Sequence, residues 1–185
     1  MERPTGHLPG PRVRLSPPTD ADRPDLDDLD WRRSLHPGMG GWLVRPIAGD
    51  VRTSLVRSVT DDEPIGVIDV APLPGYAEVM SVSLYIDPTR ARGGLAFEAY
   101  ARVVTQLFES GTRLVHHEVL ELNRPILRLF RGIGEPPSAR LREHAYSAGR
   151  LWDVLVFAFD SPRWNHLLGR LVPRNPVRRA PSEDD

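Results

Sequence analysis

Residues 86–99 read IDPTRARGGLAFEA, and the pattern of the chain changes within them. A β-rich run ends at Ile86, a polar loop with two adjacent glycines follows, and helical periodicity begins at Leu95. The first N–H groups of a helix lack partners within it, and the helix dipole favours negative charge there. The stretch therefore predicts an anion site between a strand and a helix, with Arg90 and Arg92 as cations for phosphate oxygens.

The same stretch also fits an ordinary connection in which glycines only shape the turn. It is not a G-x-G-x-x-G fingerprint, and the strands around it are not part of repeated βαβ units. A dinucleotide site is therefore not expected. A Walker-type phosphate loop is excluded as well, because all 24 Lys+Arg residues are arginine and that loop needs its lysine.

Composition removes further classes of chemistry. Without lysine there is no Schiff base, and without cysteine there is no thiolate nucleophile, disulfide or cysteine-ligated metal. The formal charge of −1 gives no basic field for nucleic acid. No apolar run approaches the roughly 20 residues of a membrane helix, and the first residues form no secretory signal. We therefore expect a cytoplasmic protein without a nucleic-acid or membrane partner and without a metal.

The chain of 185 residues has the length of one globular domain. Prolines cluster at both ends, so we expect poorly ordered segments at 1–11 and 173–185 around a single domain at 12–172. Periodicity and turn residues predict the order strand, helix, three strands, helix, strand, helix, two strands and a closing helix. The predicted class is α/β (α+β), with a mostly antiparallel sheet. The predicted strands are 13–15, 53–59, 65–70, 78–86, 114–120, 140–146 and 151–159, and the predicted helices are 20–35, 95–109, 125–130 and 162–171.

Residues 12–160 resemble the GNAT superfamily of acetyl-CoA-dependent N-acetyltransferases, most closely its ribosomal-protein N-terminal acetyltransferase branch. The matching segments, in order, are 64–68, 84–99, Asn123 at the start of a helix, and the hairpin 149–156. The resemblance implies a six- to seven-stranded mixed sheet that is splayed between its fourth and fifth strands and flanked by helices. It also implies acetyl-CoA as co-substrate.

The resemblance further implies where acetyl-CoA binds. Its diphosphate would lie on the backbone from Arg92 to Phe97, and its pantetheine arm would pair with an exposed strand edge and end near Asn123. Asn123 also fits a plain helix cap, and the two roles are compatible. The loop departs from the family at Ala91, where a glutamine or arginine is usual, which leaves open which guanidinium assists. The implied cofactor-binding residues are Leu84, Tyr85, Ile86, Arg90, Arg92, Gly93, Gly94, Leu95, Ala96, Phe97 and Asn123.

Glu118 is the candidate general base. Acyl transfer to an amine requires a neutral amine, and without cysteine the economical mechanism is direct attack in a ternary complex. Glu118 stands five residues before Asn123, where the ribosomal branch carries its base, and the alternative is a structural pair with an arginine. The neighbouring histidines, 116 and 117, point to opposite faces of the predicted strand and are interpreted as structural.

Phe130 occupies the position where the ribosomal branch carries a tyrosine that protonates the thiolate. The ring is kept and the hydroxyl is lost, so we expect slow catalysis that Phe130→Tyr would accelerate. The acceptor is a small-molecule amine or a protein N-terminus, held by loops near 35–50 and 133–139, in a monomer or homodimer. The alternative function is a catalytically weak or inactive module that binds acyl-CoA or serves assembly.

Overall fold

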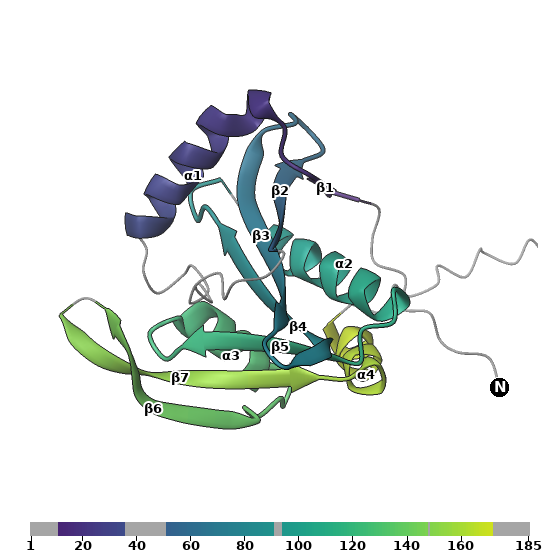
Figure 1. The fold of residues 1–185 in the computed structure, drawn as a ribbon, viewed down its shortest axis with the longest axis vertical. Helices are drawn as coiled ribbons and strands as arrows, with labels where there is room; N and C mark the ends of the chain where they lie inside the picture. Colours follow the sequence, from purple (N-terminus) through teal and green to yellow (C-terminus); the bar gives the residue numbers. More distant parts are fainter. Residues whose placement is uncertain (1–10, 36–50, 91–93, 148, 172–185) are drawn as a thin grey trace, which may run out of the picture.

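The computed structural model describes residues 11–35, 51–90, 94–147 and 149–171 (Figure 1). The two predicted poorly ordered ends lie outside these ranges apart from Pro11, as do Arg92, Gly93 and most of the acceptor loop 35–50. The elements are β1 (Val13–Ser16), η1 (Asp20–Asp22), α1 (Arg23–Leu35), β2 (Arg52–Ser58), β3 (Pro64–Leu73), β4 (Tyr76–Ile86), α2 (Leu95–Glu109), β5 (Leu114–Leu120), α3 (Arg124–Gly132), β6 (Ala139–Ser147), β7 (Arg150–Phe159) and α4 (Ser161–Leu171).

The described strands form a single mixed sheet in the order β1-β2-β3-β4-β5-β7-β6. Neighbouring strands are antiparallel except β4 and β5, which are parallel and are connected through α2. The predicted α/β fold with a mostly antiparallel sheet is therefore confirmed. The predicted hairpin turns are present too, with Gly75 between β3 and β4 at a φ of 80°.

Helices cover both faces of the sheet because side chains alternate along each strand. On one face, Leu29 of α1 packs with Leu55, Val67 and Tyr85 of the three central strands. On the other face lies the main core, to which α2, α3 and α4 contribute. Residues one position along the same strands, such as Val56, point into this second core.

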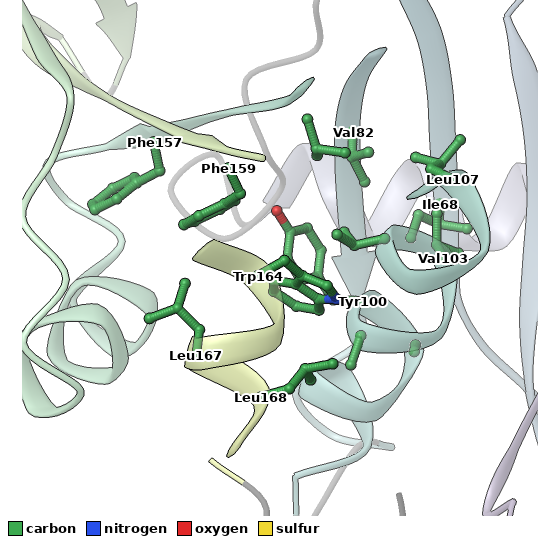
Figure 2. Close-up of a cluster of buried hydrophobic side chains, with 14 of the residues drawn as sticks. Ile68, Val82, Tyr100, Val103, Leu107, Phe157, Phe159, Trp164, Leu167 and Leu168 are labelled. Carbon is green, nitrogen blue, oxygen red and sulfur yellow. The ribbon is translucent and has the colours of Figure 1, made fainter. Parts of the chain in front are cut away.

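The main core is centred on aromatic rings below β5 and β7. Trp164 of α4 lies 5.9 Å from Phe159 of β7 and 5.9 Å from Tyr100 of α2, measured between ring centroids. Its indole N–H donates to the hydroxyl of Thr105 at 3.0 Å. Figure 2 shows these rings beside aliphatic side chains of α2 and β4. The closing helix α4 thus fixes α2 against the sheet.

Strands β4 and β5 pair over a short distance and then separate. Their partners in register end at Ser81 and His116, although β4 continues to Ile86 and β5 to Leu120. Beyond that point β4 pairs only with β3, and β5 only with β7. The result is a fork with two facing backbone edges, as the resemblance implied for the fourth and fifth strands. We call the segments Val82–Ile86 and His117–Leu120 the fork.

Gly66 holds β3 against the end of β4. A Cβ at this position would lie 2.3 Å from the carbonyl oxygen of Tyr85 and 2.5 Å from Cδ1 of Ile86, which is impossible without moving the strand. Glycine at residue 66 is therefore required by the close approach of the two backbones and keeps the β4 side of the fork in place.

Candidate active site

The loop after β4 is stabilised by Asp87. The Asp87 carboxylate accepts hydrogen bonds from the Thr89 N–H at 2.8 Å and the Thr89 hydroxyl at 2.7 Å. The Asp87 N–H donates to the carbonyl of Ile65 at 2.9 Å. This turn directs the chain away from the sheet at the open end of the fork, so the loop and the start of α2 lie at that end.

Gly94 occupies the N-cap position of α2 with a φ of 85°, a left-handed conformation that favours glycine. The N–H groups of Leu95, Ala96 and Phe97 stand in the first turn and have no carbonyl partner within the helix. This helix end therefore has the free N–H groups that an anion site requires. The structure describes Gly94 to Phe97, whereas Arg92 and Gly93 lie outside the described residues.

Arg12 is a residue that sequence reasoning missed. Its N–H and its Nε each donate to the carboxylate of Glu98 at 2.8 Å, and Arg102 contacts the same carboxylate at 3.3 Å. Its Nη2 lies 4.0 Å from the point where a Cβ on Gly94 would stand. A guanidinium therefore stands beside the N-terminus of α2. Because 86 positions separate Arg12 from Glu98, only the acidic residue in the first turn of the helix offered a signal.

Glu98 is a buried carboxylate, with a side chain that is 3% exposed. Burial raises its pKa, but the hydrogen bonds from the Arg12 backbone and guanidinium and from Arg102 outweigh this effect. The net pKa lies below the ordinary value, so the group is a carboxylate at neutral pH. The carboxylate pairs with both guanidinium groups and anchors the residue before β1 to α2.

Arg90 is directed elsewhere than the sequence suggested. Its guanidinium donates to the carbonyl of Pro64 at 2.9 Å and to the carboxylate of Asp28 at 3.3 Å, and its Nε lies 3.6 Å from Asp87. These contacts connect the loop to β3 and α1. The charge of Arg90 is therefore matched by two carboxylates, and its first role is to hold the loop.

Glu118 lies on β5 within the fork, and its side chain is 19% exposed. Its carboxylate stands 3.8 Å from Nε2 of His116, which shares its face of the strand. Within the described part of the chain, no guanidinium lies within 4.0 Å of this carboxylate, so the alternative of a structural pair with an arginine is not found there. The carboxylate is shielded from bulk water but remains partly accessible.

His117 faces the main core and is structural, as predicted. Its Nδ1 lies 2.9 Å from the carbonyl oxygen of Val82, and because a carbonyl only accepts, Nδ1 carries the proton. Burial lowers the pKa of His117 to about 4, so the ring is neutral at pH 7. The hydrogen bond joins β5 to β4 at the base of the fork, one residue beyond the last paired position.

Asn123 and Phe130 lie on the far side of β5. Asn123 occupies the N-cap position of α3, as predicted, and is buried, but its side chain makes no capping hydrogen bond. Its amide is therefore not committed to the helix end. The Phe130 ring is 6% exposed and stacks on Phe157 with centroids 4.1 Å apart, which places it in the core beside His117.

A sheet that opens between two parallel strands, next to a helix N-terminus with a glycine cap, defines a class of acyl-CoA-dependent transferases. The sequence carries the same signal: residues 18–134, more than half of the chain, match the acetyltransferase (GNAT) family. The chain belongs to this family and is an enzyme of the N-acetyltransferase class. No protein with a curated description matches the sequence.

Solved structures share the fold at low identity. RimJ from Mycobacterium smegmatis, in complex with CoA-disulfide, superposes with a TM-score of 0.67 at 15% identity over 86% of this chain and 88% of RimJ. Spermidine N-acetyltransferase from Vibrio cholerae, in complex with CoA and spermine, superposes with a TM-score of 0.67 at 15% identity, over 83% of this chain and 98% of that enzyme. For yncA from Salmonella typhimurium, a putative acetyltransferase with acetyl-CoA, the TM-score is 0.63 at 14% identity, over 80% of this chain and 93% of yncA.

The described residues contain neither a metal-binding cluster nor a membrane-spanning helix. Among the described residues, no three histidine, aspartate or glutamate side chains gather closely enough to hold a metal ion. No helix in the described part of the chain is long and apolar enough to cross a membrane.

Proposed function

We propose that this enzyme transfers an acetyl group from acetyl-CoA to a primary amine by direct attack in a ternary complex. The observation that carries the proposal is the fork, whose unpaired edges lie beside the glycine-capped N-terminus of α2. An extended thioester arm needs such an edge, and a diphosphate needs such a helix end. The CoA-bound structures that share the fold support this choice of donor.

The diphosphate site in this proposal consists of the backbone from Arg92 through Gly93 and Gly94 to Leu95, Ala96 and Phe97. Arg12 supplies the guanidinium, because its Nη2 lies 4.0 Å from the Cβ position of Gly94 while its Nε pairs with Glu98. Among the described residues, the nearest atom to a Cβ on Gly94 would lie 4.0 Å away, which leaves room on that side of the glycine for phosphate oxygens.

The pantetheine arm would pair with backbone groups of Leu84, Tyr85 and Ile86. The Tyr85 side chain is committed to the α1 face, so this residue would act through its backbone alone. Asn123 is available at the far side of the fork, since its amide does not cap α3. Together these residues would hold the thioester beside β5.

Glu118 would take the proton that an ammonium group must lose before attack. Its position in the fork, its partial exposure and the lack of an arginine partner among the described residues support this role. The acceptor is a small-molecule amine or a protein N-terminus: one neighbour in fold binds spermine, and another modifies an N-terminal serine of a ribosomal protein. The competing proposal is a weakly active or inactive acyl-CoA-binding module.

A thermal-shift experiment tests the donor. Acetyl-CoA and CoA should each raise the melting temperature, because a ligand at a hundredfold excess over its Kd stabilises the folded state by about 2.7 kcal/mol. ATP and NAD serve as controls for a general phosphate effect. No response to either CoA species would remove the proposed function, whereas equal responses to all four ligands would reduce the site to a nonspecific anion site.

A further inference from the structure

Tyr100 carries a buried polar group that the mechanism above does not use. It is the sixth residue of α2, it is 7% exposed, and its ring centroid lies 5.0 Å from that of His117. Figure 2 shows its hydroxyl pointing away from Leu168 and toward the strands that carry Val82 and Phe159. The hydroxyl is therefore directed at the sheet and not at solvent.

This hydroxyl has no hydrogen-bond partner among the residues that the structure describes. His117, whose ring packs against Tyr100, uses its Nδ1 proton for the carbonyl of Val82. A buried hydroxyl without a partner destabilises the folded state, and a phenylalanine would fill the same space without that penalty. The tyrosine therefore calls for an explanation other than packing.

The position of Tyr100 and His117 in the sheet suggests an explanation for the unpaired hydroxyl. Val82 and His117 are the first residues beyond the last paired positions of β4 and β5, so Tyr100 lies against the base of the fork. Phe130, at the position where the resemblance implied a tyrosine, lies near the same histidine, with ring centroids 6.4 Å apart. A hydroxyl absent from α3 is thus present on α2 in the same aromatic cluster.

We propose that Tyr100 is a catalytic residue that donates a hydrogen bond to the departing thiolate of CoA. The inference rests on the proposed function, since it requires the thioester to lie in the fork. When the C–S bond breaks, its electron pair goes to sulfur, and the Tyr100 O–H stabilises the charge that develops there. The proton lost by the attacking nitrogen passes to Glu118.

Tyr100 keeps its own proton in this step. Burial raises the pKa of this phenol well above its ordinary value, so the group keeps its proton at neutral pH. The thiolate takes a proton from water when CoA leaves, which a thiol with an ordinary pKa of about 8.5 does readily near neutral pH. The hydroxyl therefore lowers the barrier without being consumed.

The test is Tyr100→Phe, measured for activity and stability in the full-length chain. We expect kcat to fall about tenfold with an unchanged KM for acetyl-CoA, and the melting temperature to stay equal or rise, because an unpaired hydroxyl is removed. Tyr146→Phe, on an exposed side chain, is the matched control and should change neither quantity. An unchanged kcat in Tyr100→Phe overturns the proposal, whatever the melting temperature does.

A second variant covers the case in which both kcat and the melting temperature fall. Tyr100→Phe/Phe130→Tyr returns a hydroxyl to the cluster from α3, and recovery of kcat supports the proposal, whereas no recovery contradicts it. The wild type is assayed first. If it releases no thiol with any amine, the proposed function fails; if it is active and Tyr100→Phe equals it, only the assignment of Tyr100 fails.

Discussion

At the scale of single residues, Glu118 carries the chemical proposal. Replacing it by glutamine keeps the size of the side chain and removes the base, so we expect kcat to fall about 10²-fold while acetyl-CoA affinity stays within about twofold. The deficit should shrink as pH rises, because more of the amine is then already neutral. Initial rates from pH 6.5 to 9.5 measure this, with Glu109→Gln on α2 as control. Equal activity of Glu118→Gln and wild type at pH 7 would return Glu118 to a structural role.

Arg12 is the residue whose role the structure revealed. Arg12→Met removes a guanidinium from a carboxylate that is 3% exposed, and we expect the free energy of unfolding to fall by about 1–3 kcal/mol. We also expect acetyl-CoA affinity to fall about tenfold, because the cation beside Gly94 is lost.

The control for Arg12 is Arg14→Met. Arg14 pairs with Asp62 on the surface, where both side chains are more than half exposed, and such pairs contribute about 0–1 kcal/mol. Urea unfolding and calorimetric titration with acetyl-CoA compare the two variants. If Arg12→Met binds acetyl-CoA as tightly as Arg14→Met does, Arg12 is an anchor for α2 and not part of the diphosphate site.

At the scale of elements, two substitutions in the loop between β4 and α2 distinguish the effect of backbone strain from the effect of an added negative charge. Gly94→Ala introduces the strain of a left-handed residue, about 1–2 kcal/mol, because its Cβ meets nothing closer than 4.0 Å in the described part of the chain. Gly94→Glu adds a negative charge at the anion site and competes for the guanidinium of Arg12. We expect calorimetry to rank acetyl-CoA affinity as wild type, then Gly94→Ala, then Gly94→Glu without detectable binding. Unchanged affinity in Gly94→Glu would show that the loop is not the binding site.

The elements themselves were predictable because their signals are local. Alternation and turn residues located the strands to within a few residues, as in β5, which was predicted and found at Leu114–Leu120. The position of Asn123 at the start of α3 was predicted correctly, whereas its side chain does not make the capping hydrogen bond that this residue type favours. The contacts of Arg12 with Glu98 and of Tyr100 with His117 depend on how α2 packs, which no local pattern encodes.

Those parts of the candidate site that depend on backbone geometry could be predicted from the sequence. The helix end at Gly94 follows from the strand, glycine and helix order, and it is present as expected. The contacts of Arg90 were not predictable, because the sequence does not reveal that Asp28 of α1 comes within 3.3 Å of its guanidinium. A charged side chain near a loop therefore predicts a binding site less reliably than the backbone conformation of the loop does.

At the scale of the whole molecule, His117 makes stability depend on pH. Burial lowers its pKa from 6.5 to about 4, so between these values the unfolded chain binds more protons than the folded one. Above pH 6.5, His117 does not reduce the free energy of unfolding. As pH decreases from 6.5 toward 4, this group lowers the free energy of unfolding by at most about 1.4 kcal/mol per pH unit.

His117→Asn tests this dependence, since asparagine keeps a donor for Val82 but does not titrate. We expect the urea midpoint of the variant to change less than that of wild type between pH 6.5 and 4.5, and the two slopes to agree above pH 7. Carboxylates with lowered pKa, such as Asp153, lose their contribution only at lower pH, as pH falls through the folded pKa. Parallel slopes between pH 6.5 and 4.5 would mean that His117 is not a buried neutral group.

Release of free CoA thiol from acetyl-CoA by the wild-type chain, across polyamines, aminoglycoside-like amines, amino acids and peptide N-termini, tests the proposed acetyl transfer most directly. We predict that at least one class releases thiol in equal amount to the acetylated amine, with rates that saturate in both substrates and vanish without amine. Stabilisation by acetyl-CoA without thiol release for any amine class would contradict catalysis and leave an acyl-CoA-binding module.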